Sequence, residues 1–378
     1  MKKLIIISIL SLIFSLNTYS QRLYEEEALE VGIESIDNFR EFLSLKNDAN
    51  NIDDIDKLIK WTSVKFNKLG FKLKRLETES IPLLLAESNF NKNYKTILIY
   101  MHLDGQPVDR NKWFQDDPYL PVLKKPNPKG EYEIIDWNNI KNKTLEEIQN
   151  EDLRIFARSA SDAKGPVMML INALEILKSN NLKPKFNIKL IMDFEEEKSS
   201  PNLPSAVLKY SNDLESDGLL IFDGPQHSSG LPTLNFGNRG ISKITLTTYG
   251  PIVPQHSGHF GNYAPNPVFR MSKILSSMKD ENGIVLIDGY YDGIEITNKV
   301  REDLNRVPDN EVKMLSEMQF KSPEKVGKSY QEALQYPSLN VRGIQSGWVK
   351  DEVRTIVPAE CIAEIDIRLV IESDGYRL

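Results

Sequence analysis

The stretch TILIYMHLD, residues 96–104, decides the fold of this chain. Its first six residues form an apolar run typical of a buried strand, and His102 follows that run directly. Two later runs have the same form: NIKLIMDF (residues 187–194) leads into three glutamates, and GLLIF (residues 218–222) leads into Asp223. Three predicted strands therefore each end in an imidazole or carboxylate side chain.

A helix is predicted between the first two of these strands. Gly165 and Pro166 stand where it would begin, and proline is well accepted in a first helical turn. The apolar stripe that follows comprises Val167, Met169, Leu170, Leu174 and Leu177. Strands that alternate with helices predict an α/β sheet. Because ligands bind beyond the carboxyl ends of the strands in such sheets, we expect the three strand ends to form one site.

Two other regions differ from this pattern. Residues 121–150 are polar and rich in Lys, Pro and Asn, which indicates a surface excursion. From about Gly240 onward the expected elements are a strand at 241–249, a helix that begins near Asn266, and strands near 338–344 and 363–370. We therefore expect one domain at residues 21–239 and a smaller inserted α+β domain at residues 240–378.

The first twenty residues also differ from the rest. Two lysines precede an apolar run at residues 4–14, and small polar residues follow it. This order is typical of a secretory signal peptide at residues 1–20, with cleavage before Gln21. The alternative is a membrane anchor, but a spanning helix needs about 20 apolar residues. We therefore expect export to a periplasmic or extracellular location, with no membrane attachment after cleavage.

The composition limits the class of protein. The chain has 378 residues, of which 40% are hydrophobic, and this is enough for two cores. Its net charge of -7 argues against nucleic acid as a partner. Cys361 is the only cysteine, so no intrachain disulfide can form. Any site metal would therefore be held by His, Asp and Glu side chains.

Two short motifs carry candidate ligands. In His102-Leu-Asp104 the imidazole is suited to zinc, and a nearby carboxylate commonly fixes the tautomer of such a ring. In RSASDAKGP (residues 158–166), Asp162 stands at a helix start, where backbone N–H groups favour an anion. Each motif also has a structural interpretation, as a His–Asp pair or as a helix cap.

The three glutamates after the strand at residues 187–194 form the third motif. Adjacent carboxylates repel one another, and burial of one requires a cation or a raised pKa, although a solvated acidic turn is the alternative. Together His102, Asp162, one glutamate and Asp223 form a ligand set suited to zinc. A second glutamate remains as a general base for metal-assisted hydrolysis.

These motifs resemble those of the di-zinc metallopeptidases that include aminoacylase, carboxypeptidase G, succinyl-diaminopimelate desuccinylase and carnosinase. The resemblance is closest to the carnosinase-like dipeptidases and runs from about residue 25 to the end of the chain. It implies a zinc-exopeptidase-like α/β catalytic domain with an inserted α+β, ferredoxin-like lid and dimerisation domain. It also implies two zinc ions, a homodimer formed through the lid, and hydrolysis of small peptides, with N-acyl amino acids as alternative substrates.

The resemblance assigns a role to each motif residue. His102, Asp162, Glu197 and Asp223 would be the metal ligands, with Asp162 bridging both ions. Asp104 would orient His102, and Glu196 would be the general base that activates the bridging water. The chain departs from the family pattern at four positions, where Ser159, Asp193, Phe194 and Ser199 replace Gly, Glu, Gly and Gly. The last three departures are expected to reshape the acidic loop.

The resemblance also assigns substrate contacts in the second domain. His256, in a His-Ser-Gly run, would reach a neighbouring subunit's active site and stabilise the oxyanion. Thr355 and Arg368 would hold the carboxylate of the substrate, since a guanidinium pairs well with that group.

One expected ligand has no counterpart in this sequence. In the relatives, the chain continues beyond the strand that carries Arg368 and supplies a last histidine to the zinc held by the acidic loop. The sequence ends at Leu378, and His227 has no family counterpart as a ligand. The expectation is therefore that both domains are incomplete, either as a fragment of an active peptidase or as an inactive protein that binds at most a metal or a peptide.

Overall fold

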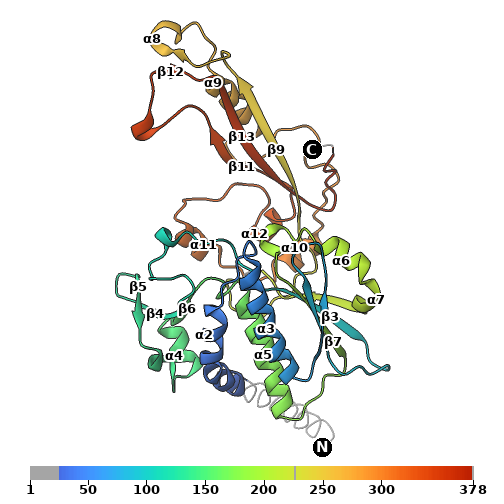
Figure 1. Ribbon diagram of the computed structural model, residues 1–378. Helices are drawn as coiled ribbons and strands as arrows, with labels where there is room; N and C mark the ends of the chain where they lie inside the picture. Colours follow the sequence, from blue (N-terminus) through green and yellow to red (C-terminus); the bar gives the residue numbers. More distant parts are fainter. Residues whose placement is uncertain (1–24, 225–226, 377–378) are drawn as a thin grey trace, which may run out of the picture. The chain divides into compact units, whose positions relative to one another are not determined.

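The computed structural model describes residues 25–224 and 227–376 (Figure 1). The predicted signal peptide lies outside the described residues. The chain divides into two compact units, of which the first ends at Gly224 and the second covers residues 225–378. The predicted domain boundary stood later in the sequence, at residue 239. Within the described ranges, no helix is both long and apolar enough to cross a membrane.

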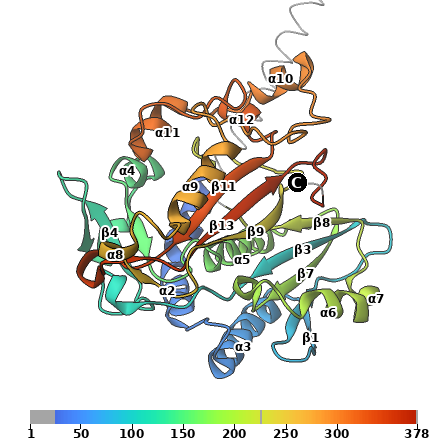
Figure 2. The same ribbon diagram turned by 90° about the horizontal axis from the view of Figure 1, so that it is seen from above.

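The first unit is built on a five-stranded sheet with the strand order β1-β2-β7-β3-β8. The strands are β1 (Lys72–Leu76), β2 (Leu83–Glu87), β3 (Thr96–His102), β7 (Asn187–Asp193) and β8 (Gly218–Ile221). Figure 2 shows β3 between β7 and β8, and it pairs with both in parallel. The carboxyl ends of the three predicted strands therefore meet at one edge, and the predicted α/β fold is confirmed.

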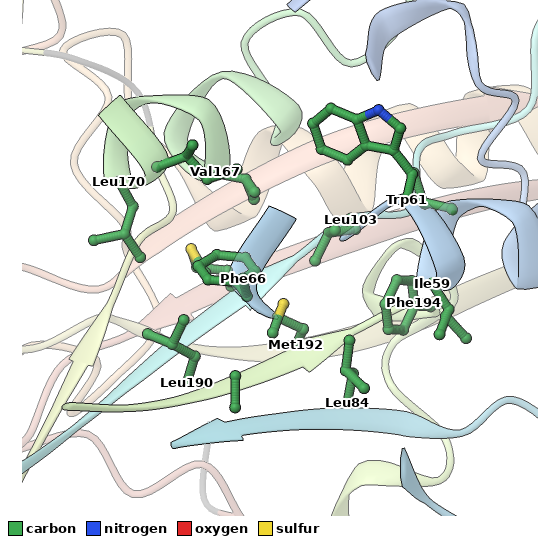
Figure 3. Close-up of a cluster of buried hydrophobic side chains, with 14 of the residues drawn as sticks. Ile59, Trp61, Phe66, Leu84, Leu103, Val167, Leu170, Leu190, Met192 and Phe194 are labelled. Atoms are coloured by element: carbon green, nitrogen blue, oxygen red, sulfur yellow. The ribbon is translucent and has the colours of Figure 1, made fainter. Parts of the chain in front are cut away.

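Helices cover both faces of this sheet. Leu190 and Met192 belong to the buried cluster under α3 and α5 (Figure 3). Ile191, between them in sequence, packs with residues of α6 and α7. Such two-sided burial explains why the central strands are continuous apolar runs. The helices are α2 (Ile36–Ser44), α3 (Ile52–Lys68), α5 (Lys164–Ser179), α6 (Leu203–Lys209) and α7 (Ser211–Leu214).

Helix α5 is the predicted helix, with one correction to its buried face. Val167 and Leu170 are buried as expected, but Met169 is 64% exposed and Met168 is buried in its place. The buried face at the start of α5 is therefore formed by Val167, Met168 and Leu170.

The region predicted as a polar excursion has secondary structure of its own. It contains β4 (Val122–Pro126), β5 (Tyr132–Ile135) and α4 (Leu145–Asn150), and β6 (Arg154–Phe156) follows it. The strands form an antiparallel sheet with the order β5-β4-β6. Leu123, Ile140 and Leu153 form a small separate core beneath it. The few apolar residues of this segment are thus enough to fold it as a three-stranded unit.

The second unit is a three-stranded antiparallel sheet with the order β11-β13-β9. Its strands are β9 (Gly240–Tyr249), β11 (Ser338–Gln345) and β13 (Glu360–Leu369). Helix α9 (Pro267–Met278) packs on one face, where Met271, Cys361 and Ala363 are buried. The remaining elements are β10 (Gln255–His256), α8 (Ser257–Phe260), α10 (Asn298–Leu304), α11 (Glu311–Met318), α12 (Tyr330–Ala333) and β12 (Ile356–Val357). This arrangement confirms the predicted α+β class.

Candidate metal centre

Three of the predicted ligands lie together at the carboxyl edge of the first unit's sheet. His102 is the last residue of β3, Asp162 stands just before α5, and Asp223 follows β8. His102 Nε2 lies 2.9 Å from Asp162 Oδ1 and 3.8 Å from Asp223 Oδ1. One ligand atom from each residue falls within a 4.8 Å group. The strand order brings the ends of β3 and β8 together, and the segment before α5 lies beside them.

The His102 ring is fully buried, and within the described part of the chain neither of its nitrogens makes a hydrogen bond. Two ligands that share a cation are arranged in this way: an imidazole nitrogen faces a carboxylate oxygen, and no hydrogen bond joins them. Buried polar atoms are otherwise nearly always hydrogen-bonded. The site therefore fits a metal ion, and its imidazole and carboxylate donors match the preference of zinc.

The carboxylates around His102 favour a positive charge at this point. Burial by itself lowers the pKa of the imidazole, but Asp104, Glu196 and Asp223 outweigh burial and raise it to about 9. Without a metal the ring would thus hold a proton at neutral pH. Because a metal ligand must be neutral, metal binding would displace that proton.

Asp104 connects His102 to the acidic loop. Its buried carboxylate lies 3.4 Å from His102 Nδ1. It also accepts hydrogen bonds from the backbone N–H groups of Glu196 at 3.1 Å and Glu197 at 3.0 Å. One carboxylate therefore faces the ring and fixes the start of the turn that carries both glutamates, while its role in orienting His102 stays a prediction.

The acidic loop separates its four carboxylates by function. Glu195 is buried and its Oε1 accepts hydrogen bonds from Asn202, while Asp193 accepts hydrogen bonds from Tyr100 and Ser200. These two side chains hold the loop in shape. Glu196 and Glu197 follow in a short 3-10 turn and are half-buried. They are the two carboxylates of the loop left for chemistry.

Glu196 and Glu197 differ in their surroundings. Burial raises the pKa of the Glu196 carboxyl, His102 opposes this, and the Asp223 and Glu197 carboxylates add to the increase. Glu197 Oε2 accepts a hydrogen bond of 2.7 Å from Gln106 Nε2. Glu197 lies outside the 4.8 Å group that His102, Asp162 and Asp223 form. Its role as a ligand stays a prediction.

Serines occupy backbone positions where the family pattern has glycine. Ser159 has a φ of 60° and Ser199 a φ of 68°. Both values lie in the left-handed region that glycine adopts most easily. The loops therefore keep the conformation that the glycines would favour, although their side chains differ. The peptide bond between Asp162 and Ala163 is cis.

The predicted substrate residues lie in two places within the second unit. His256 ends β10, and the backbone N–H of Ser257 donates to Thr355 O at 3.2 Å, so His256 and Thr355 are neighbours. Arg368 is exposed near the other end of the ten-residue strand β13. At about 3.3 Å per residue, that strand is roughly 30 Å long. A single copy of this unit therefore does not bring Arg368 together with the other two.

Arg368 has a second guanidinium beside it that the sequence did not indicate. Burial, and then the positive charge of Arg368, lower the pKa of Arg239. Neither arginine side chain has an acidic partner among residues 25–224 and 227–376. Two neighbouring cations without a counter-ion are suited to a carboxylate.

His227 pairs with Asp309 at 3.1 Å within the second unit.

Comparison with known proteins follows the same division of the chain. A family model described as a peptidase dimerisation domain matches residues 236–377. The Beta-Ala-His dipeptidase of Mus musculus is 27% identical over 297 residues, which are 76% of this chain and 54% of the relative. The Cys-Gly metallodipeptidase dug1 of Schizosaccharomyces pombe is 26% identical over 334 residues, 81% of this chain and 62% of the relative. The chain thus spans about half the length of the mammalian relative.

Solved structures agree with these matches. The M20 family metallo-carboxypeptidase Sso-CP2 from Sulfolobus solfataricus is 28% identical, with a TM-score of 0.68 over 91% of this chain and 73% of that one. Human carnosine dipeptidase 1 shares the fold at 21% identity, with a TM-score of 0.68 over 93% of this chain and 73% of that one. The fold thus resembles that of a metallopeptidase, and the second unit matches a peptidase dimerisation domain. The chain is similar to a solved metallopeptidase of the M20 family.

Proposed function

We propose that this protein is a zinc-dependent dipeptidase that hydrolyses the amide bond of small peptides. The observation that carries the proposal is the buried His102 imidazole, which faces Asp162 and Asp223 without a hydrogen bond to either. The names of the relatives, Beta-Ala-His dipeptidase and Cys-Gly metallodipeptidase, support dipeptides as the substrate class.

In this proposal each residue of the site has one task. His102, Asp162, Asp223 and Glu197 hold the metal, and Asp104 orients the His102 ring. Zinc bound there would polarise the scissile carbonyl and supply hydroxide at neutral pH. The Glu196 carboxylate takes a proton from the attacking water and passes it to the leaving amine. Its raised pKa suits that exchange, because a general base works best when its pKa is near the operating pH.

The second unit would bind the substrate's carboxylate. Arg368, with Arg239 beside it, provides an unpaired positive charge for that group. His256 and Thr355 lie beyond the other end of β13, too far from Arg368 to contact the same dipeptide from one copy of the unit. If all of these residues act, two copies of the chain must contribute, and this favours a homodimer.

We expect the zinc-loaded protein to hydrolyse β-Ala-His or Cys-Gly and to lose that activity when a chelator removes the metal. Release of the free amino acids measures turnover, and readdition of zinc should restore it. N-acetyl amino acids in the same assay test the alternative substrate class. Zinc binding without turnover of any of these substrates would contradict the proposal and favour a protein that only binds metal or peptide.

We expect the protein to dimerise through β9 and α9. Strand β9 is an edge strand of its sheet, and beside it Tyr249 is 64% and Ile274 39% exposed. An exposed strand edge with apolar neighbours is a ready pairing surface. Light scattering should give the dimer mass for the unmodified chain and the monomer mass for Ile274→Asp. Leu208→Asp, at a site that is 80% exposed in the first unit, should remain dimeric. A monomeric unmodified chain would contradict this expectation.

A further inference from the structure

Asn47 lies in the turn between α2 and α3, far from every motif of the metal centre in sequence. It is fully buried, although asparagine side chains are mostly exposed in proteins. Hydrogen bonds compensate the desolvation of its Nδ2 group, whereas its Oδ1 has no hydrogen-bond partner among the described residues. The partners of Asn47 therefore indicate what it does.

Those partners belong to the two loops that carry the metal ligands. Asn47 Nδ2 donates to Leu103 O at 2.8 Å and to Ser159 Oγ at 3.0 Å. Its backbone oxygen accepts from the N–H of Gly105 at 2.9 Å. Leu103 and Gly105 directly follow His102 and Asp104, and Ser159 opens the loop that ends in Asp162. One residue thus bonds to both sides of the ligand set.

The two loops approach each other closely at this point. A Cβ atom on Gly105 would lie 2.2 Å from Ser159 Oγ and 3.0 Å from Asn47 Nδ2. A side chain at position 105 would therefore displace the Ser159 hydroxyl, which occupies the space beside the glycine. Because Ser159 replaces a glycine of the family pattern, the hydrogen bond from Asn47 to its side chain is a feature of this chain's own sequence.

Few other contacts fix the distance between these loops. The loop that carries Asp162 is not a strand of the central sheet, so no ladder of backbone bonds sets its position. Apart from the bonds of Asn47, one side-chain hydrogen bond joins the two loops within the described ranges. It runs from Arg158 to Pro107 O at 3.5 Å, the limit for such a bond. Asn47 makes shorter bonds to both loops from a buried position.

The turn that carries Asn47 is itself held firmly. The buried Lys164, at the start of α5, donates to Phe42 O at 3.0 Å and to Leu45 O. Phe42 stacks on Trp61 of α3 with ring centroids 4.2 Å apart. Asn47 therefore projects from a rigid segment, which a residue must do if it is to set the position of its partners.

We propose that Asn47 is a positioning residue that fixes the separation of His102 and Asp162 before a metal binds, and thereby sets metal affinity. This inference rests on the proposed metal centre. Residues that hold metal ligands in place typically contribute a factor of about 10 to 100 in affinity. Asn47 acts on two ligand loops at once, so its removal should have an effect of that size.

The test compares zinc affinity of the full, metal-free chain and of Asn47→Ala by competition with a chromophoric chelator. We expect Asn47→Ala to bind zinc about 10- to 100-fold more weakly. The visible spectrum of the cobalt-loaded protein should also change, because the ligand geometry relaxes. A loss of stability alone would not alter that spectrum.

Asn187→Ala is the matched control. Asn187 is also a buried asparagine that joins loops, through bonds to Asn91 and Tyr94, but it lies at the opposite end of the sheet, where β7 begins. It should lower stability without changing zinc affinity or the cobalt spectrum. If both variants weaken zinc binding equally, a general loss of stability explains the result and the inference is overturned.

A second variant covers the case in which Asn47→Ala does not fold. Ser159→Gly removes one hydrogen bond of Asn47 and suits the left-handed φ at that position, so it should fold and bind zinc about 2- to 12-fold more weakly, the usual range for one bond. Unchanged affinity in the variants that fold would overturn the role of Asn47. Absence of zinc binding by the unmodified protein would instead overturn the metal centre itself.

Discussion

Glu196→Gln is expected to lower kcat/KM for a dipeptide by roughly 10²- to 10⁴-fold while zinc binding is retained, which is the usual effect of losing a general base. The amide has the shape of the carboxyl group but cannot take a proton from water. The backbone N–H of Glu196 would still donate to Asp104, so the turn should keep its conformation. Turnover and zinc affinity, measured on the same preparation, separate the two effects.

Glu195→Gln is the matched control for that experiment. Glu195 is the preceding residue, but it is buried and its Oε1 accepts hydrogen bonds from Asn202. An amide oxygen can accept the same bonds, so activity should change little. If Glu196→Gln retains full activity, Glu196 is not the base. If it loses zinc as well, Glu196 is a ligand and another residue must accept the proton.

The central sheet and the convergence of its strand ends could be predicted because they depend on local patterns. Each of β3, β7 and β8 is an apolar run, and parallel neighbours necessarily present their carboxyl ends at the same edge. The positions of His102 and Asp223 follow from that rule, whereas Asp162 stands before α5 and not at the end of a sheet strand. Helix α5 could also be predicted, except that Met168 and not Met169 lies on its buried face.

The division of labour within the acidic loop could not be predicted from the run of carboxylates. Asp193 and Glu195 turn inward because Ser200 and Asn202, further along the chain, bond to them. Those bonds depend on the left-handed backbone at Ser199, which no side-chain pattern reveals. The role of Asn47 could not be predicted for a related reason. Its partners Leu103 and Ser159 lie 56 and 112 residues away in sequence.

The substrate residues of the second unit illustrate a different limit. Thr355 and Arg368 are only 13 residues apart in sequence, and a motif treats them as one group. An extended strand separates them instead, because β13 begins at Glu360 and Arg368 is the ninth of its ten residues. Thr355 and Arg368 can therefore act on one substrate only if two chains assemble. A pattern in a single sequence does not show how two chains assemble.

Phe194→Ala is expected to lower the free energy of unfolding by about 3–5 kcal/mol, the usual cost of truncating a buried phenylalanine. Phe194 is fully buried and belongs to the cluster that includes Ile59 and Met192 (Figure 3). The resemblance to the family placed a glycine here, so the phenylalanine was expected to reshape the loop. It packs into the core instead. Urea unfolding followed by tryptophan fluorescence measures the effect.

Phe114→Ala provides the control, because Phe114 is 97% exposed and its removal should change stability by less than about 0.5 kcal/mol. A loss below about 1 kcal/mol for Phe194→Ala, well under the range for a buried aromatic, would mean that the ring is not packed as described. Phe194→Gly should cost more than the alanine variant by about 0.5–1 kcal/mol, because glycine adds backbone freedom at a strand end.

The same variant links core packing to the proposed chemistry. Phe194 stands between β7 and the turn of Glu196 and Glu197, so its buried ring anchors the start of the loop. Asp104 fixes the same turn by accepting hydrogen bonds from its backbone N–H groups. If that anchoring matters, Phe194→Ala should weaken zinc binding under conditions in which the variant is still fully folded. If zinc affinity is unchanged, the bonds from Asp104 are sufficient, and the phenylalanine serves stability alone.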